Sequence, residues 1–312
     1  MITNAGHTVV AIKKPQIYSN QFVSTMFRLT NGLPFFTIQP VVNFDAVSSS
    51  DYAWFVAKGL PDYGTNYQGG AIWYGRLQWT NTTAVGLDTN WFVVSNSGPT
   101  YRDYYDLDGT GSLTLPTNGV VAPQPNGPGG QTSSLSLYRA GSRLMTAVIR
   151  NGSLWTCHTV GLSGTNGAYN GDQSGASVDR SAIQWFRFNV DASGGTMTCA
   201  TNRRIYDAVS PANAMYYYVP SLMVNCAGDM VTGFSGSSVS SYVGAYYCWR
   251  LASGVELNQP RLVRAGTTFF DQLRWGDYSA TTLDPTDDWS FWTVQEYSDV
   301  LQTRYTPRGN AL

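Results

Sequence analysis

The residues best suited to catalysis lie in two short segments. Arg274 and Asp277 stand close together near the C-terminal end of the chain, and His158 ends the expected strand that contains Trp155. A carboxylate or an imidazole can act as a general base near neutral pH, and a guanidinium can stabilise developing negative charge. We therefore predict that Asp277, His158 and Arg274 are the catalytic residues of a hydrolase. The structural alternative for His158 is a buried side chain held by backbone groups.

A second group of side chains is suited to hold the substrate. Its members are polar residues at the ends of expected strands, or aromatic neighbours of Asp277, and they are Gln39, Gln124, Arg150, Trp275 and Tyr278. Amides and guanidinium groups can bond sugar hydroxyls or a carbonyl, and aromatic rings supply apolar contact. The alternative is structural, because Gln and Arg at such positions also bond neighbouring backbone and hold sheets together.

One segment has the composition of a calcium loop. Asp106 and Asp108 alternate with other residues ahead of a glycine, an arrangement that offers oxygen ligands to a hard cation. We predict Ca²⁺ bound by Asp106 and Asp108, and no organic cofactor. Ordinary turns capped by Asp side chains would explain the same pattern.

The elements that must position these residues are β-strands. Segment 274–297 has a polar start, a strand, a turn with Asp284 and Pro285, and a second strand rich in aromatic residues. In the turn, Asp side chains should bond their own backbone while the proline fixes the bend. Looser copies of this pattern begin at Gln39, Gln124 and Tyr218. Such repetition predicts an all-β fold, a single β-propeller with four-stranded antiparallel blades.

Composition supports a single β domain over residues 1–312. The chain has 20 Tyr, 13 Phe, 10 Trp and 32 Gly, and 12% of its residues are charged. Residues 8–12 are expected to be the last strand of a blade, so the chain begins inside a blade that C-terminal strands should complete. We prefer about five blades, with six as the alternative. The predicted site lies at the mouth of the central channel.

Net charge and hydropathy limit the classes of partner that the protein is expected to bind. The net charge is −1 and Lys and Arg form no cluster, which argues against nucleic acid and anionic membrane as partners. No apolar run reaches the roughly 18 residues of a membrane span. A small-molecule or glycan ligand fits this composition better.

Four cysteines allow two interpretations. Cys226 could pair with Cys248 and Cys157 with Cys199, or all four could be buried thiols. The low charge and the Gly-rich and aromatic-rich loops are typical of extracellular proteins, although the first residues lack the pattern of a signal peptide. We expect an extracellular or periplasmic protein whose leader has been removed.

Three segments carry a resemblance to a known family. Segments 152–159, 218–221 and 274–297 are similar to those of a family of secreted bacterial proteins. The resemblance implies a β-propeller of sialidase-like shape. It implies no agreed activity, and fold alone supplies none.

Two functions are therefore open. The first is a hydrolase that cleaves a glycoside or a lactone at the channel mouth. It would use Ca²⁺ or the Arg, His and Asp side chains for catalysis. The alternative is a non-catalytic module that binds carbohydrate or protein. In that case, exposed aromatic side chains stack on the ligand, and the candidates are Tyr101, Tyr104, Tyr105 and Tyr169.

Overall fold

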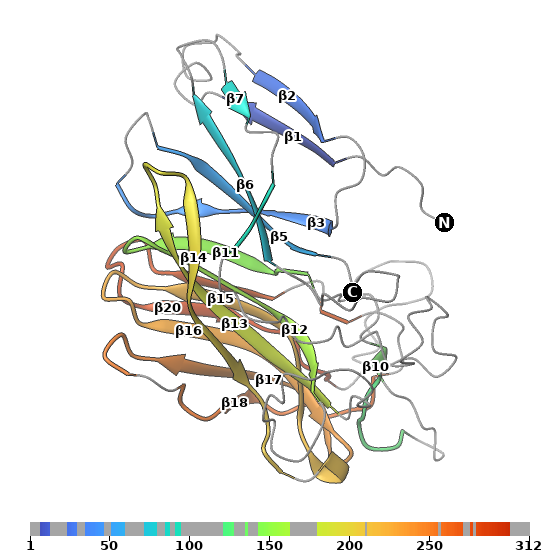
Figure 1. The fold of residues 1–312 in the computed structure, drawn as a ribbon. Coiled ribbons are helices and arrows are strands. Elements are labelled where there is room, and N and C mark those ends of the chain that lie inside the picture. Colours follow the sequence, from blue (N-terminus) through green and yellow to red (C-terminus); the bar gives the residue numbers. More distant parts are fainter. Residues whose placement is uncertain are drawn as a thin grey trace, which may run out of the picture. The chain divides into compact units, whose positions relative to one another are not determined.

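The computed structural model shows an all-β protein made of several antiparallel sheets (Figure 1). Its described elements are β-strands and one short 3-10 turn, η2 (Pro211–Asn213). Within the described part of the chain, no helix is long and apolar enough to cross a membrane. The structure describes residues 7–12, 24–29, 35–46, 51–59, 72–79, 85–87, 91–94, 121–127, 135–136, 143–162, 180–209, 211–254, 257–270, 275–276 and 279–299.

The first large sheet is a meander whose strands pair in the order in which they occur in the chain. It runs in the order β3-β5-β6-β7, and β8 also pairs with β6. Buried Val56 lies opposite buried Tyr74, so one face of the sheet is apolar. The strands are β3 (Phe35–Pro40), β5 (Ala53–Gly59), β6 (Ile72–Trp79), β7 (Val85–Leu87) and β8 (Phe92–Val93).

The second large sheet adds a strand from an earlier part of the chain to a four-stranded meander. Its order is β14-β13-β12-β11-β4, and β4 pairs with β11 in parallel. Asn151 and Gly152 form the two-residue turn between β11 and β12, and both have positive φ, as a type I′ turn requires. The strands are β4 (Val42–Asn43), β11 (Thr146–Arg150), β12 (Ser153–Leu162), β13 (Arg180–Asp191) and β14 (Thr196–Ile205).

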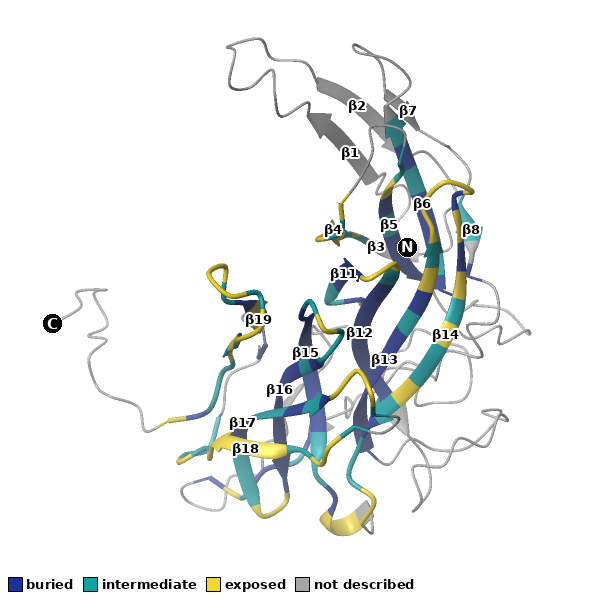
Figure 2. Ribbon diagram, turned by 90° about the vertical axis from the view of Figure 1, so that its left-hand side faces the viewer, coloured by how far each residue is buried: buried dark blue, intermediate teal, exposed yellow. Residues whose placement is uncertain are grey.

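The third large sheet is the meander β15-β16-β17-β18, and the hairpin β19-β20 follows it in the chain. Its edge strand β18 is exposed at every position, whereas β15 and β16 are mostly buried (Figure 2). The strands are β15 (Tyr216–Val224), β16 (Met230–Ser238), β17 (Ser241–Arg250), β18 (Arg261–Arg264), β19 (Ala280–Leu283) and β20 (Phe291–Val294). Two smaller pairs complete the fold, and they are β1 (His7–Ile12) with β2 (Ser24–Leu29) and β9 (Val121–Ala122) with β10 (Leu135–Ser136).

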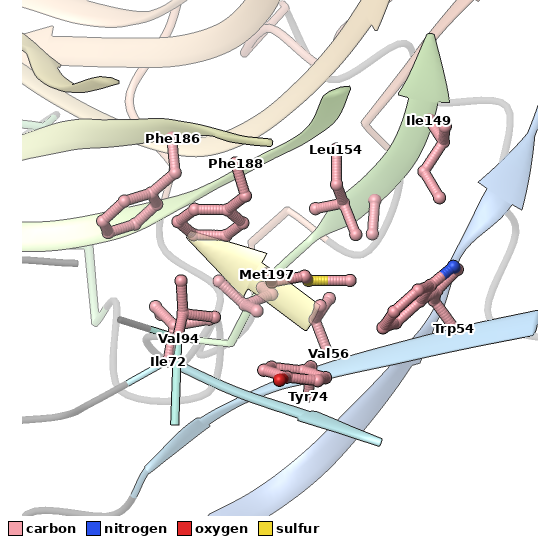
Figure 3. Packing of buried hydrophobic residues seen from close by; sticks show 12 residues of the cluster. Trp54, Val56, Ile72, Tyr74, Val94, Ile149, Leu154, Phe186, Phe188 and Met197 are labelled. Carbon is pink, nitrogen blue, oxygen red and sulfur yellow. The ribbon is translucent and has the colours of Figure 1, made fainter. Parts of the chain in front are cut away.

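The chain forms two compact units. Unit 1 consists of Met1–Asp103, Ser142–His158 and Trp185–Arg203, and unit 2 of Tyr104–Gly141, Thr159–Gln184 and Arg204–Leu312. The apolar core of unit 1 gathers side chains from β5, β6 and β11–β14 (Figure 3). Phe186 and Phe188 stack there with ring centroids 5.4 Å apart, and Met197 packs in the same cluster. In unit 2, Tyr218, Leu222 and Phe234 are fully buried.

The all-β prediction is confirmed, and the predicted hairpin at 274–297 is present as β19 and β20. The strand expected at 8–12 is also present, as β1. None of the described sheets closes on itself. All four cysteines lie within the described residues and are thiols, and Cys157 and Cys248 are buried as the second interpretation expected, whereas Cys199 and Cys226 are partly exposed. Burial raises the pKa of the Cys199 and Cys248 thiols, so both resist ionisation.

Candidate functional site

The hairpin β19-β20 contacts β15 of the same unit through hydroxyl and amide groups. Its inward-facing residues Thr281 and Thr293 lie opposite each other in the pair of strands, with their Oγ1 atoms 3.0 Å apart. Ser221 of β15 lies beneath them, 2% exposed, and its Oγ is 2.8 Å from Oγ1 of Thr281. This face of the hairpin is therefore held by polar contacts and not by an apolar core alone.

Ser221 is the centre of this network. Its Oγ accepts hydrogen bonds from Ser279 Oγ at 2.9 Å and from Gln295 Nε2 at 3.1 Å. Gln295 Nε2 also bonds Thr293 Oγ1 at 2.9 Å, and Ser279 Oγ lies 2.9 Å from Gln295 Oε1. The one hydroxyl proton of Ser279 can therefore go to Ser221 or to Gln295, so the network has two proton arrangements. We call Ser221, Ser279, Thr281, Thr293 and Gln295 the Ser221 cluster.

The backbone beside this cluster is strained. Val219 has φ of 52°, which is unfavourable for a β-branched residue, and the register of β15 and β16 shifts between Tyr218 and Ser221. Such a conformation costs about 1–3 kcal/mol and persists only where surrounding contacts enforce it. One such contact is the bond from the Val219 N–H to Thr159 Oγ1, at 3.0 Å. A Cβ on Gly276 would overlap the Val219 side chain, so that side chain is confined from the other side as well.

Glu296 and Ser235 fix the start of the C-terminal segment. The Gly276 N–H donates to Glu296 Oε2 at 3.0 Å, and the Trp275 indole N–H donates to Ser235 Oγ at 3.0 Å. The Trp275 ring also meets Phe270 edge to face, with centroids 4.8 Å apart. Thr159 and Gly276 thus both contact Val219 within unit 2.

The opposite face of the hairpin is exposed. Trp289, Trp292 and Val294 are 57%, 61% and 66% exposed, and we call these three residues the hairpin surface. The indole N–H of Trp292 donates to Asp284 Oδ2 at 3.0 Å, which fixes the orientation of the ring. The ring of Trp292 therefore presents apolar area to solvent in a defined position.

Two aspartates organise the turn that carries this surface. Asp284 Oδ1 accepts from the hydroxyl and N–H of Thr286, and Asp287 accepts from the hydroxyl and N–H of Ser290 and from the N–H of Trp289. These hydrogen bonds hold the pKa of both carboxyls below the usual value for aspartate. The predicted role of these aspartates in capping the turn is confirmed, and both are ionised at neutral pH.

Three predicted site residues lie in unit 1. His158 is fully buried and stacks on Phe186, with ring centroids 5.8 Å apart. Arg150 is 7% exposed and places its guanidinium 5.5 Å from the centre of the Phe44 ring. Gln39, in β3, is partly exposed, and its amide donates to the Pro40 carbonyl at 3.3 Å. His158, Arg150 and Gln39 thus each contact a different residue.

Two of the predicted site residues that the structure describes lie in unit 2, and both have structural contacts. Gln124 is buried, and its amide bonds both backbone groups of Phe270, donating to the carbonyl at 2.6 Å and accepting from the N–H at 3.1 Å. The Gln124 amide thus forms with Phe270 the same two kinds of hydrogen bond that the backbone of a paired β-strand residue forms. Trp275 is buried against Ser235 and Phe270, as described above. The structural alternative weighed for Gln124 fits this geometry.

The remaining predictions fall outside the described residues. These residues are Arg274, Asp277, Tyr278, Asp106 and Asp108, together with Tyr101, Tyr104, Tyr105 and Tyr169. Their roles stay predictions. Among the residues that the structure does describe, no group of His, Cys, Asp and Glu side chains could hold a metal ion.

Sequence reasoning missed the Ser221 cluster and the hairpin surface. The alternation in 279–283 and 291–295 was a usable signal, because residues two apart point to the same face of a strand. Thr281 and Leu283 are buried, whereas Thr282 between them is exposed. Nothing local indicated that Ser221, some 58 residues before Ser279, would complete the cluster.

Comparison with protein families and curated proteins finds no match: no protein-family model matches the chain, and no curated protein matches it. Fold and site alone therefore define the class, an all-β protein of antiparallel sheets. Its C-terminal hairpin rests on a hydroxyl and amide network and exposes two tryptophans.

Proposed function

We propose that the protein is a carbohydrate-binding module that uses the hairpin surface of Trp289, Trp292 and Val294. The carrying observation is the exposed Trp292 ring, which is 61% exposed and is oriented by its bond to Asp284. A flat ring fixed before binding can stack on the apolar face of a sugar with little further loss of conformational entropy. Because the indole N–H is already engaged, the ring contributes its face and not a hydrogen bond.

The charge around this surface favours a neutral or amino-bearing glycan. Asp284 and Asp287 are ionised beside Trp289 and Trp292, and the whole chain carries a net charge of −1. An anionic polysaccharide would meet repulsion here. The low charge of the chain and its aromatic content also support the extracellular or periplasmic location that we propose.

Replacement of Trp292 with alanine is expected to weaken glycan binding about 30-fold or more, as loss of a central aromatic contact does in other interfaces. Wild type and variant would be compared on a glycan array of neutral, amino and anionic oligosaccharides, followed by affinity electrophoresis with each retained polymer. Trp292→Tyr should keep part of the affinity. Leu262→Ala, at a site 52% exposed on β18 in the same unit, is the matched control and should bind as wild type does. No retention on any glycan, or equal retention of Trp292→Ala, would reject the proposal.

We also propose that the meanders are blades of the propeller expected from the sequence, with about five blades in all. The order β15-β16-β17-β18 supports this proposal, because each strand pairs with the next in the chain. The run β11 to β14 and the run β3, β5, β6, β7 have the same form. Blades of a propeller are four-stranded antiparallel meanders of this kind.

A hydrolase is the second candidate function. It is supported by the hydrogen bonds of Gly276 and Ser279, the residues on either side of Asp277 and Tyr278 in the chain. Gly276 is bonded to Glu296, and Ser279 to Ser221, so the chain enters and leaves this dipeptide at fixed points. In this proposal Asp277 is the general base and Arg274 stabilises negative charge, with Ca²⁺ held by Asp106 and Asp108 as the candidate cofactor. His158, fully buried, is the weaker candidate base.

If the protein is a hydrolase, Asp277→Asn should lower turnover of a chromogenic glycoside or lactone about 100-fold or more, as loss of a general base does. The panel would be run with added calcium and with chelator, and Asp106→Asn should copy the effect of the chelator. Trp292→Ala serves as the comparison, because loss of a binding contact raises KM more than it lowers kcat. Absence of turnover by wild type in both conditions would leave the binding module as the only function proposed.

A further inference from the structure

The turn between β11 and β12 is clamped by a carboxylate from another part of unit 1. Asp45 Oδ1 accepts from the Asn151 N–H, and Asp45 Oδ2 accepts from the Gly152 N–H, both at 2.7 Å. Asp45 is itself positioned by its N–H bond to Asn43 Oδ1 at 2.9 Å and by the bond from Phe44 N–H to the Ile149 carbonyl at 3.1 Å. The two exposed turn residues therefore form an anion-binding pair of N–H groups, and Asp45 occupies it.

Asn151 and Gly152 form an Asn-Gly pair, in which deamidation of the asparagine side chain is least hindered. Glycine has no side chain to obstruct attack by its own backbone nitrogen. The Gly152 nitrogen loses its proton and attacks Cγ of Asn151. A C–N bond forms, the bond from Cγ to Nδ2 breaks, and ammonia leaves with the proton. Water then opens the cyclic succinimide at either carbonyl, which gives aspartate or isoaspartate at position 151. The reaction needs only water and no oxidant.

We propose that Asn151 is a site of this deamidation and that Asp45 restrains it. The nitrogen that must attack is the donor in a charge-assisted hydrogen bond, which must break before the proton can leave. The amide anion that forms when the Gly152 nitrogen loses its proton would also lie beside a carboxylate, which is electrostatically unfavourable. Asp45 is thus a positioning residue that keeps the Gly152 nitrogen protonated.

The product would disturb the turn. Either product places a second carboxylate at position 151, next to that of Asp45, where like charges repel. Isoaspartate also lengthens the backbone of a two-residue turn that sets the pairing of Arg150 with Ser153. Deamidation at this position should therefore loosen β4 from β11.

The test is the rate of deamidation at Asn151 in folded protein, measured by peptide mapping and mass spectrometry during incubation in mildly alkaline buffer. Asp45→Ala should raise the rate at Asn151 about tenfold or more, the factor expected for loss of a hydrogen bond to a charged group. The chain supplies internal references in its other Asn-Gly pairs, whose rates should not change. These pairs begin at Asn31, Asn118, Asn126, Asn166 and Asn170.

Asp191→Ala is the matched control. The Asp191 carboxylate accepts from the N–H groups of Ser193 and Gly194 in the turn after β13, also in unit 1, and these bonds hold its pKa below the usual value. Its loss removes an equivalent clamp without touching Asn151, so the rate there should stay at the wild-type value. Equal rates in wild type and Asp45→Ala, or an equal rise in Asp191→Ala, would overturn the proposal. If Asp45→Ala does not fold, Asp45→Asn decides, because its amide nitrogen cannot accept a hydrogen bond and its oxygen carries no full charge, so the charge-assisted clamp on the two N–H groups is lost. An unchanged rate in Asp45→Asn would again overturn the proposal.

Discussion

Phe186→Ala is expected to lower the free energy of unfolding by about 3–5 kcal/mol, the usual cost of deleting a fully buried aromatic side chain. Phe186 has no exposed area, and it stacks on both Phe188 and His158. Its removal leaves a cavity that neighbouring β-strands cannot close without breaking their ladders. Urea denaturation followed by tryptophan fluorescence would measure the change.

The control for Phe186 is another phenylalanine of unit 1. Phe44 is 41% exposed, and Phe44→Ala should cost less than about 1 kcal/mol, as surface substitutions usually do. A similar cost for Phe44→Ala and Phe186→Ala would mean that the core shown in Figure 3 does not carry the stability of unit 1.

Gly233→Val is the second substitution with a large expected effect. A Cβ at this position of β16 would overlap Thr293 Oγ1 and Gln295 Nε2, so a branched side chain must displace these two side chains from the Ser221 cluster. Overpacking of this kind costs about 1–3 kcal/mol, and the hydrogen bonds of the Ser221 cluster would be lost as well. We expect destabilisation of about 3 kcal/mol or more together with weaker glycan binding. Thermal unfolding and the affinity assay would be run on the same preparation.

Thr232→Val is the matched control, because Thr232 is next to Gly233 and side chains of neighbouring strand residues point to opposite faces. Thr232 is fully buried, and within the described part of the structure its hydroxyl has no hydrogen-bond partner. Replacing that hydroxyl with a methyl group should be neutral or slightly stabilising. If Thr232→Val lowered stability as much as Gly233→Val, the loss would come from disruption of β16 itself and not from its contact with the hairpin.

Local chemistry accounts for the elements that the sequence predicted correctly. The aspartates of 284–288 bond their own backbone, which is why the turn between β19 and β20 could be recognised from residue types alone. The copy of the repeated pattern expected from Tyr218 onward coincides with strands β15 to β17, because its runs of apolar and aromatic residues are separated by residues that form turns. These features depend on residues within a few positions of each other.

The features that escaped prediction depend on distant residues. Gln124 bonds the backbone of Phe270, 146 positions later, and its role follows from that partner and not from its neighbours. Val219 precedes a proline, which locally favours an extended conformation with negative φ, yet its φ is 52°. Bonding to Thr159 and packing against Gly276 override that preference. The Ser221 cluster likewise forms only when β15 and the hairpin are both in place.

The parallel pairing of β4 with β11 bears on how fast unit 1 folds. The clamp that accompanies it joins Asp45 to Asn151 across 106 positions. Chains dominated by such distant pairings fold in milliseconds to seconds, because a long loop must close before the contacts reward it. Mutations at Asp45 should therefore slow folding if this junction forms in the transition state, and should speed unfolding alone if it forms afterwards.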